Sequence, residues 1–221
     1  MKFSDKLYDG VIDLWLEAVD KPFVKEMAEG TLDEDLFRNY MIQDYLYLLE
    51  YIDILGLIYD LAEGEDLRDF LQVVIKETEN ETYRVHLPHM RKMGVSDEEI
   101  DGTIRSKAIS EYTGYMREKV KEHGLLAGLT ALLQCSWLYA FIGKKAVAEK
   151  TDAISKSPYR FWFDAYTCTD YIDANQMWID TVDRETKGIS IDEEAQLTGI
   201  FMTCAGYENR LWDELWLRHL Y

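Results

Sequence analysis

The chain has 221 residues, 48% of them hydrophobic and 30% charged, a composition that excludes disordered and fibrous proteins and suits one folded domain. Its formal net charge of −18 opposes binding to nucleic-acid phosphates and to anionic membrane surfaces. Three cysteines without a Cys-x-x-Cys pair favour reduced thiols in the cytoplasm over a disulfide framework or a zinc site. The first 15 residues carry acids from Asp5 onward and no uninterrupted apolar stretch, so no signal peptide is expected.

Helix signals recur along the whole chain. Ser/Thr-x-x-Glu capping boxes at Thr31, Ser96 and Ser190 predict three helix starts. Pro88 is expected to kink or break the helix that contains it. Only three prolines and no alternating strand pattern oppose a β fold, so the sequence predicts one all-α domain over residues 1–221. The expected helices cover residues 3–18, 21–29, 33–62, 65–93, 97–101, 104–123, 125–149, 159–167, 170–186 and 191–219.

The segment from Leu125 to Gly143 has no charged side chain and is just long enough to span a bilayer. It also contains polar residues, including Thr130, Gln134 and Ser136, and no second segment resembles it. A helix that is hydrophobic on all sides is usually buried inside a globular protein. We therefore expect a central core helix rather than a membrane span.

Asp44 is a carboxylate among tyrosines and leucines in a strongly helical segment. Helical spacing puts it on one face with Tyr47 and Tyr51. From the residues alone, Asp44 is an exposed aspartate, a buried aspartate hydrogen-bonded to a tyrosine, or a ligand-binding carboxylate.

Cys135 lies in the middle of the most apolar segment, one helical turn before Tyr139. Both side chains can therefore face one cavity. Buried cysteines are more often inert packing, so the position alone does not assign a reaction. Cys168 and Cys204 have no distinctive neighbours in the sequence.

Glu208 stands one turn before Trp212 on the last expected helix, on or beside its apolar side. It is either an acid that faces a pocket or the partner of a nearby cation such as Arg210 or Arg218.

Residues 79–89 contain the carboxylates and histidines of a possible metal site, namely Glu79, Glu81, His86 and His89. The Glu-x-x-His pattern of di-iron helical bundles is absent, because neither histidine follows a glutamate at that spacing. We therefore expect no metal ligands and no cofactor.

Five segments taken together resemble the TenA family, the thiaminase II or aminopyrimidine aminohydrolase group. The resemblance implies a single-domain, heme-oxygenase-like helical bundle that assembles as a homotetramer. It also implies hydrolysis of thiamin or 4-amino-5-aminomethyl-2-methylpyrimidine to hydroxymethylpyrimidine for thiamin salvage. The segments are QDYLYL (Gln43–Leu48), EYTGYM (Glu111–Met116), CSWLYAFIG (Cys135–Gly143), YRFWFDAY (Tyr159–Tyr166) and YENRLW (Tyr207–Trp212).

The resemblance assigns Cys135 as the nucleophile. It assigns Asp44 to the ring nitrogen and exocyclic amine of the pyrimidine, and Glu208 to acid–base catalysis near the leaving group. The sequence departs from the family pattern at Ser136, where proline is frequent, and at Phe141, where an acidic residue is common. The substrate-binding tyrosines that it implies are Tyr47 and Tyr139 as aromatic walls and Tyr112 and Tyr166 as hydrogen-bonding groups.

Such a reaction needs a thiolate that adds to the ring, a group that protonates or hydrogen-bonds a ring nitrogen, and an acid for the leaving amine. Two other hypotheses stay open at this point. One is a metal-dependent oxidase of the same helical superfamily, using His86 or His89 with glutamates. The other is a non-catalytic regulator that binds a pyrimidine, for which the net charge argues against direct DNA contact.

Overall fold

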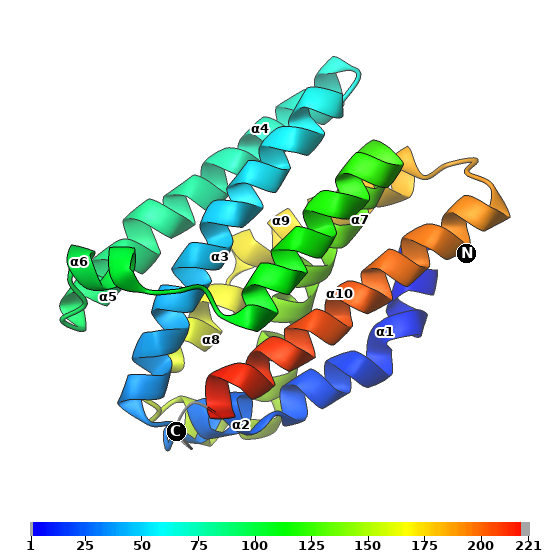
Figure 1. Cartoon of the computed structure of the whole chain (residues 1–221). Coiled ribbons are helices and arrows are strands. Elements are labelled where there is room, and N and C mark those ends of the chain that lie inside the picture. Colours follow the sequence, from blue (N-terminus) through cyan, green and yellow to red (C-terminus); the bar gives the residue numbers. More distant parts are fainter. Residues whose placement is uncertain (1, 218–221) are drawn as a thin grey trace. The chain divides into compact units, whose positions relative to one another are not determined.

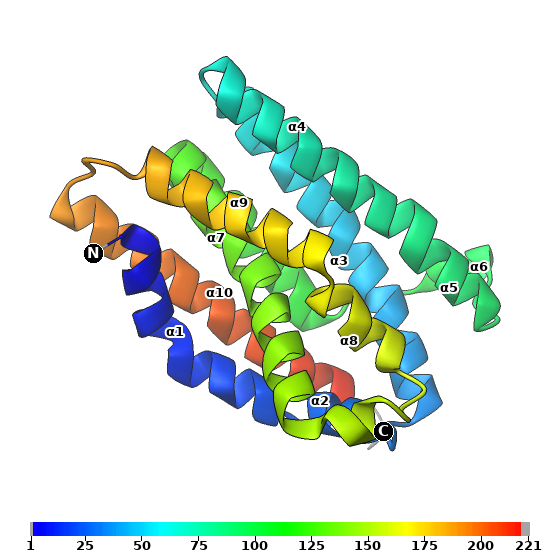
Figure 2. The same ribbon diagram turned by 180° about the vertical axis from the view of Figure 1, so that it is seen from behind.

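A computed structural model describes residues 2–217, and every regular element in this part of the chain is helical (Figures 1 and 2). The all-α prediction is therefore confirmed. Residues 218 and 219 of the last expected helix lie outside the described part. The elements are α1 (Phe3–Asp20), α2 (Pro22–Glu29), α3 (Glu34–Leu61), α4 (Glu65–Asn80), the π-helix η1 (Glu81–His86), α5 (Leu87–Lys92), α6 (Asp97–Gly102), α7 (Lys107–Ile154), α8 (Arg160–Thr167), α9 (Thr169–Glu185) and α10 (Ile191–Leu217).

Two of the three predicted capping boxes begin helices as expected. The Ser96 hydroxyl accepts a hydrogen bond from the Glu99 amide at 3.2 Å, and the Ser190 hydroxyl accepts one from the Glu193 amide at 3.1 Å. The prediction at Thr31 was wrong, because Asp33 caps α3 with its own carboxylate. A carboxylate near the positive end of the helix dipole satisfies the first free amides better than a threonine two residues earlier.

The helix expected over residues 65–93 is divided, but the change comes before Pro88 rather than at it. The π-helix η1 precedes the proline, and the Leu87 amide donates to the Thr82 carbonyl five residues earlier. Proline has no amide hydrogen for an ordinary helical bond, so the turn before it is free to widen. His86 becomes the last residue of this widened turn.

The prediction of two helices on either side of Gly124 was wrong, because one helix, α7, runs through this position. Gly124 itself has a φ of 73°, which lies in the left-handed region that favours glycine. The glycine that suggested a helix end thus marks a local irregularity inside α7. By length and composition α7 can cross a membrane, but 67% of its most apolar window is buried in the protein, as in a core helix.

The chain forms two compact units. One combines residues up to Leu32 with those from Leu129 onward, and the other comprises Asp33–Gly128. In the first, α1 packs along α10, whereas in the second α3 packs along α4 and η1 (Figures 1 and 2). The single domain over residues 1–221 stays a prediction.

An aromatic core holds the first unit together. The Trp15 ring of α1 lies 5.3 Å from Trp137 and 5.2 Å from Phe141, both on α7, and 6.1 Å from Phe201 on α10. Phe141 is partly buried and packs its ring on Trp15, at the position where the sequence resemblance leads one to expect an acidic residue.

The close approach inside the second unit gives a stability prediction. A Cβ added at Gly128 would clash with Cγ2 of Ile58 and lie 2.8 Å from Cγ2 of Val120. Gly128→Ala should therefore lower the free energy of unfolding by about 1–3 kcal/mol, measured by urea denaturation. Gly56→Ala is the matched control, because nothing lies within 4 Å of its added Cβ and α3 should gain about 0.5–1 kcal/mol. Equal effects of the two substitutions would contradict the close contact.

Candidate active site

Asp44 is buried in α3, with 6% of its surface exposed. Its Oδ2 accepts a hydrogen bond from the Tyr40 hydroxyl at 3.3 Å and lies 2.6 Å from Nε2 of His86. The structure therefore excludes the exposed aspartate and confirms a hydrogen bond to a tyrosine. A carboxylate buried at such a position needs polar partners, because leaving it unpaired would be very costly.

The contact between His86 and Asp44 was not predicted from the sequence. Nδ1 of His86 lies 3.3 Å from the Glu81 carbonyl and its Nε2 faces Asp44, so both ring nitrogens are engaged. Burial alone lowers the pKa of His86, but the hydrogen bond and charge of Asp44, with the charge of Glu81, raise it to about 9. A usable signal was the spacing of Thr82, His86 and Met90, which makes the histidine part of a buried stripe.

Two of the predicted tyrosines lie in the same unit as this pair. Tyr47 follows Asp44 by one helical turn, and its ring stacks on Tyr112 with centroids 5.6 Å apart and an interplanar angle of 25°. Both rings are buried, and Tyr51 packs against Tyr47 at 5.9 Å. The second unit thus brings together a carboxylate and flat aromatic surfaces, a combination that can hold a planar polar ring.

The other predicted residues lie in the first unit, on α7, α8 and α10. The Tyr139 ring of α7 packs on Tyr166 of α8 at 4.9 Å and on Trp212 of α10 at 5.8 Å. Cys135, which is partly exposed, lies four residues before Tyr139 on α7. Glu208, with 1% of its surface exposed, lies four residues before Trp212 on α10.

The later half of α7 and α10 run in the same direction along the chain (Figures 1 and 2). Four residues of α-helix rise by about 6 Å. Cys135 and Glu208 therefore lie on the same side of the Tyr139–Trp212 contact, each about one turn before it. This arrangement supplies a thiol and a carboxylic acid from segments 73 positions apart in the sequence.

The residue after Cys135 is anchored by two side chains of α9. The Tyr171 hydroxyl and the Asn175 amide donate to the Ser136 carbonyl at 3.1 and 3.0 Å. Nδ2 of Asn175 also lies 3.0 Å from the Ser136 hydroxyl. These contacts fix α7 against α9 directly beside the thiol, and neither donor could be identified from a sequence pattern.

The other two cysteines have different surroundings. Cys168 is exposed at the start of α9, where its thiol lies 3.1 Å from the Ala165 carbonyl. Cys204 is fully buried in α10. Neither cysteine had a distinctive neighbourhood in the sequence, and neither lies one helical turn before Tyr139 as Cys135 does.

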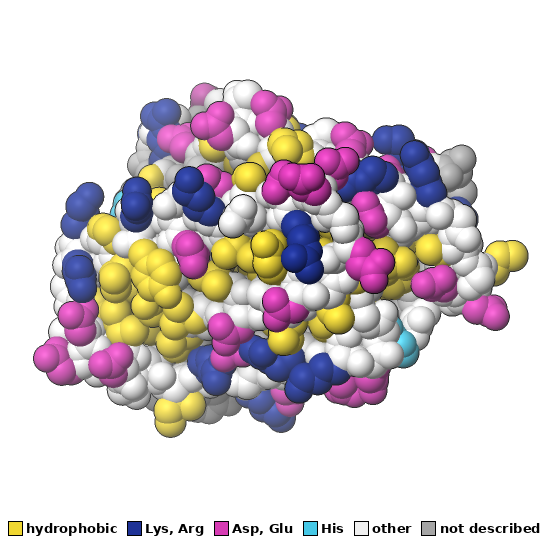
Figure 3. Space-filling model, turned by 90° about the horizontal axis from the view of Figure 1, so that it is seen from above, with side chains coloured by type: hydrophobic (Ala, Val, Ile, Leu, Met, Phe, Trp, Pro, Cys, Tyr) yellow, Lys and Arg dark blue, Asp and Glu magenta, His cyan; other side chains and the backbone are white. Residues whose placement is uncertain are grey.

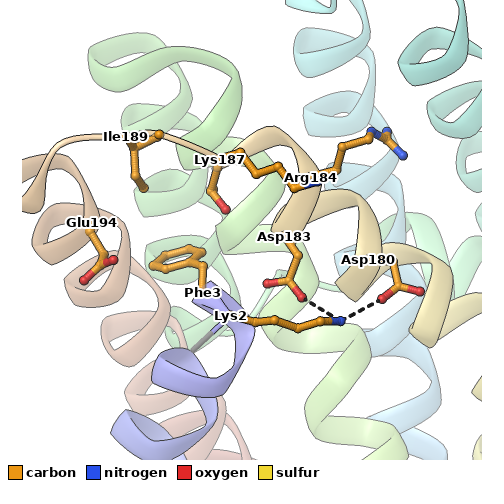
Figure 4. Close-up of a pocket in the computed structure, with 10 residues that line it drawn as sticks. Lys2, Phe3, Asp180, Asp183, Arg184, Lys187, Ile189 and Glu194 are labelled. Atoms are coloured by element: carbon orange, nitrogen blue, oxygen red, sulfur yellow. Dashed lines mark hydrogen bonds and ion pairs between the residues drawn. The ribbon is translucent and has the colours of Figure 1, made fainter.

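Figure 4 shows a separate pocket of the first unit, between the start of α1 and the end of α9. Nζ of Lys2 lies 3.5 Å from an oxygen of Asp180 and 3.4 Å from one of Asp183. None of the predicted site residues lines this pocket.

Among residues 2–217, no group of three or more histidine, cysteine, aspartate or glutamate side chains is placed to hold a metal ion. Of the two histidines considered as ligands, His86 is bound to Asp44, and Nδ1 of His89 lies 3.1 Å from the Val85 carbonyl. His219 and Arg218, the possible partner of Glu208, lie outside the described residues. The expectation of a metal-free site stays a prediction.

Comparison with known proteins adds independent support for the fold. A family model described as TENA/THI-4/PQQC matches residues 9–217. A protein of Halalkalibacterium halodurans named aminopyrimidine aminohydrolase is 30% identical over 216 residues, covering 96% of this chain and 95% of that protein. A TenA homologue from P. horikoshii has a TM-score of 0.88 at 24% identity, covering 98% of this chain and 99% of that one. A domain of unknown function with a heme oxygenase-like fold, from Shewanella denitrificans, has a TM-score of 0.75 at 16% identity, with coverages of 98% and 93%. The expected heme-oxygenase-like fold is confirmed.

The raised pKa of His86 predicts a pH dependence of stability. Its value of about 9 in the folded chain exceeds the ordinary 6.5, so folding is favoured when the imidazole is protonated. This contribution is fully present below pH 6.5 and is lost as the pH rises through 9. The free energy of unfolding from urea titrations should fall over this range more steeply in the wild type than in His86→Gln. Parallel curves for the two proteins would contradict a raised pKa.

Proposed function

Because the chain belongs to the TENA/THI-4/PQQC family, we propose that it is a thiaminase II-type aminopyrimidine aminohydrolase. Its substrate is thiamin or 4-amino-5-aminomethyl-2-methylpyrimidine, and its product is hydroxymethylpyrimidine for thiamin salvage. The observation that carries the proposal is the ring contact between Tyr139 and Trp212. It supports a thiol at Cys135 and an acid at Glu208 acting on the same small molecule.

Cys135 is the nucleophile in this proposal. Direct displacement at the methylene group of an electron-rich aminopyrimidine is slow. Addition of the Cys135 thiolate to a ring carbon, with a proton on a ring nitrogen, breaks aromaticity and lets the leaving group depart from the methylene carbon. Water then adds to that carbon, and loss of the thiolate restores the ring.

Glu208 and Asp44 have different roles in the proposed reaction. Glu208 gives a proton to a departing amine and later takes one from the attacking water. Asp44 binds the ring nitrogen and the exocyclic amine. Tyr47 and Tyr139 flank the ring as aromatic walls, while Tyr112 and Tyr166 donate hydrogen bonds to it.

The burial of both acids supports their roles within their own units. Asp44 of the second unit and Glu208 of the first are 6% and 1% exposed, so neither is turned out into solvent. Burial of that kind also favours proton transfer over exchange with water.

Assembly and location complete the proposal. We assign a homotetramer and a cytoplasmic location, the first by family resemblance and the second from three cysteines without a disulfide framework. Light scattering of the purified protein tests the first assignment.

The two other hypotheses receive less support. The oxidase would need His86 or His89 as a ligand. Both nitrogens of His86 already contact Glu81 and Asp44, and among residues 2–217 His89 belongs to no group of three possible metal ligands. A DNA-binding regulator would need a basic surface. On the face in Figure 3, lysine and arginine side chains are interspersed with aspartate and glutamate.

Cys135→Ser is the first test of the proposal. Because serine is a far weaker nucleophile, turnover of both thiamin and the aminomethylpyrimidine should fall roughly 10³-fold or more, while the helical circular dichroism is kept. Cys168→Ser is the matched control and should leave turnover unchanged, because that thiol is exposed at another place in the fold. Turnover by Cys135→Ser close to that of the wild type would reject the mechanism.

Glu208→Gln separates the two substrates. An amine leaves after receiving a proton, whereas the thiazolium of thiamin leaves as a neutral thiazole without one. The loss in kcat should therefore be larger for the aminomethylpyrimidine than for thiamin, by about 10-fold or more. Steady-state kinetics on both substrates measures this ratio, and equal losses would remove Glu208 from leaving-group protonation.

A further inference from the structure

The two oxygens of the Asp44 carboxylate have different surroundings. Oδ2 accepts from the Tyr40 hydroxyl at 3.3 Å and lies 2.6 Å from Nε2 of His86. Within residues 2–217, no donor reaches Oδ1. One oxygen is thus tied to the protein by two groups, and the other keeps its capacity to accept a hydrogen bond.

The backbone of η1 aims His86 at this carboxylate. Nδ1 of the ring lies 3.3 Å from the Glu81 carbonyl, five residues earlier, which matches the wider turn of a π-helix. The same turn is braced by the buried hydroxyl of Thr82, which donates to the Thr78 carbonyl at 2.7 Å. The backbone of η1 therefore holds Nδ1 of the ring, while Nε2 faces Asp44 on α3.

These contacts fix where the protons lie. A carbonyl oxygen only accepts, so Nδ1 of His86 must carry a hydrogen toward Glu81. Tyr40 donates to the same Asp44 oxygen that faces Nε2, and a donated hydrogen bond stabilises negative charge on that oxygen. The favoured arrangement is an imidazolium with a hydrogen on each nitrogen, bound to an ionised carboxylate.

We propose that His86 is a positioning residue for the aminopyrimidine, because its imidazolium holds Asp44 as an oriented, ionised carboxylate whose Oδ1 accepts hydrogen bonds from the substrate. The inference rests on the function proposed above. The reaction needs a group that either protonates a ring nitrogen or accepts a hydrogen bond from it, and the inference assigns Asp44 the second role. Asp44 acts as an acceptor and does not give up a proton of its own. The proton on the ring nitrogen comes from solvent as the substrate binds, and the adjacent carboxylate stabilises it there.

A purely structural ion pair would have different consequences. Loss of such a pair lowers stability, but it does not change substrate affinity through Asp44 in particular. If His86 acts through Asp44, the effect of removing it must disappear once Asp44 has lost its charge.

The test is a double-mutant cycle of His86→Gln and Asp44→Asn. Binding of hydroxymethylpyrimidine is measured by calorimetry, and kcat and KM are measured with the aminomethylpyrimidine. His86→Gln alone should weaken binding by about 10- to 100-fold, the range for losing one hydrogen bond between charged groups. In the Asp44→Asn background, the same change should alter binding less than about 2-fold.

Equal losses in both backgrounds, or unchanged binding in His86→Gln, would overturn the proposal. His89→Gln is the matched control and should bind like the wild type, because its Nδ1 contact is to the Val85 carbonyl. A wild type that neither binds nor hydrolyses any aminopyrimidine would instead reject the proposed function.

A second measurement uses the wild type alone and so does not depend on the folding of a variant. The ¹⁵N shifts of His86 in the wild type at pH 8 should be those of an imidazolium. A neutral ring in the wild type at pH 8 would also overturn the proposal.

Discussion

The hydrogen-bonded pair of Asp44 and His86 is the constraint on which the second unit depends. A carboxylate inside a helical core is tolerated only when its charge is met by a partner, because desolvation otherwise favours the neutral acid or the unfolded chain. His86 and Tyr40 meet this charge from η1 and from the preceding turn of α3. The widened turn before Pro88 is what places the imidazole ring at this point.

In the first unit, a contact between two aromatic rings relates the helices that carry the thiol and the second acid. Tyr139 and Trp212 pack where α7 and α10 pass each other, and the helical repeat places Cys135 and Glu208 one turn earlier. The hydrogen bonds from Tyr171 and Asn175 to the Ser136 carbonyl hold this stretch of α7 in place.

Both groups show how helical proteins assemble chemistry from distant segments. No short motif contains more than one of Asp44, Cys135 and Glu208. Each of these residues has an ordinary structural explanation when it is considered alone. What distinguishes them is that each lies one helical turn from an aromatic residue. Rigid helices hold such groups at fixed spacing better than loops would, which suits a reaction that requires several groups at once.

The sequence by itself determined the helical class, most helix ends and the family, because periodicity, capping residues and ordered motifs are local signals. It wrongly ended a helix at Gly124, because a local glycine signal does not show that α7 continues through it. It also selected Asp44, Cys135 and Glu208 as the polar residues on apolar faces. Only the tertiary structure decided that His86 is the partner of Asp44, that Asn175 and Tyr171 anchor Ser136, and that Asp33 rather than Thr31 caps α3. The first two are contacts between helices distant in sequence. The third is a competition between neighbouring side chains that only the folded geometry settles. Helical periodicity describes one helix at a time and therefore predicts none of the three.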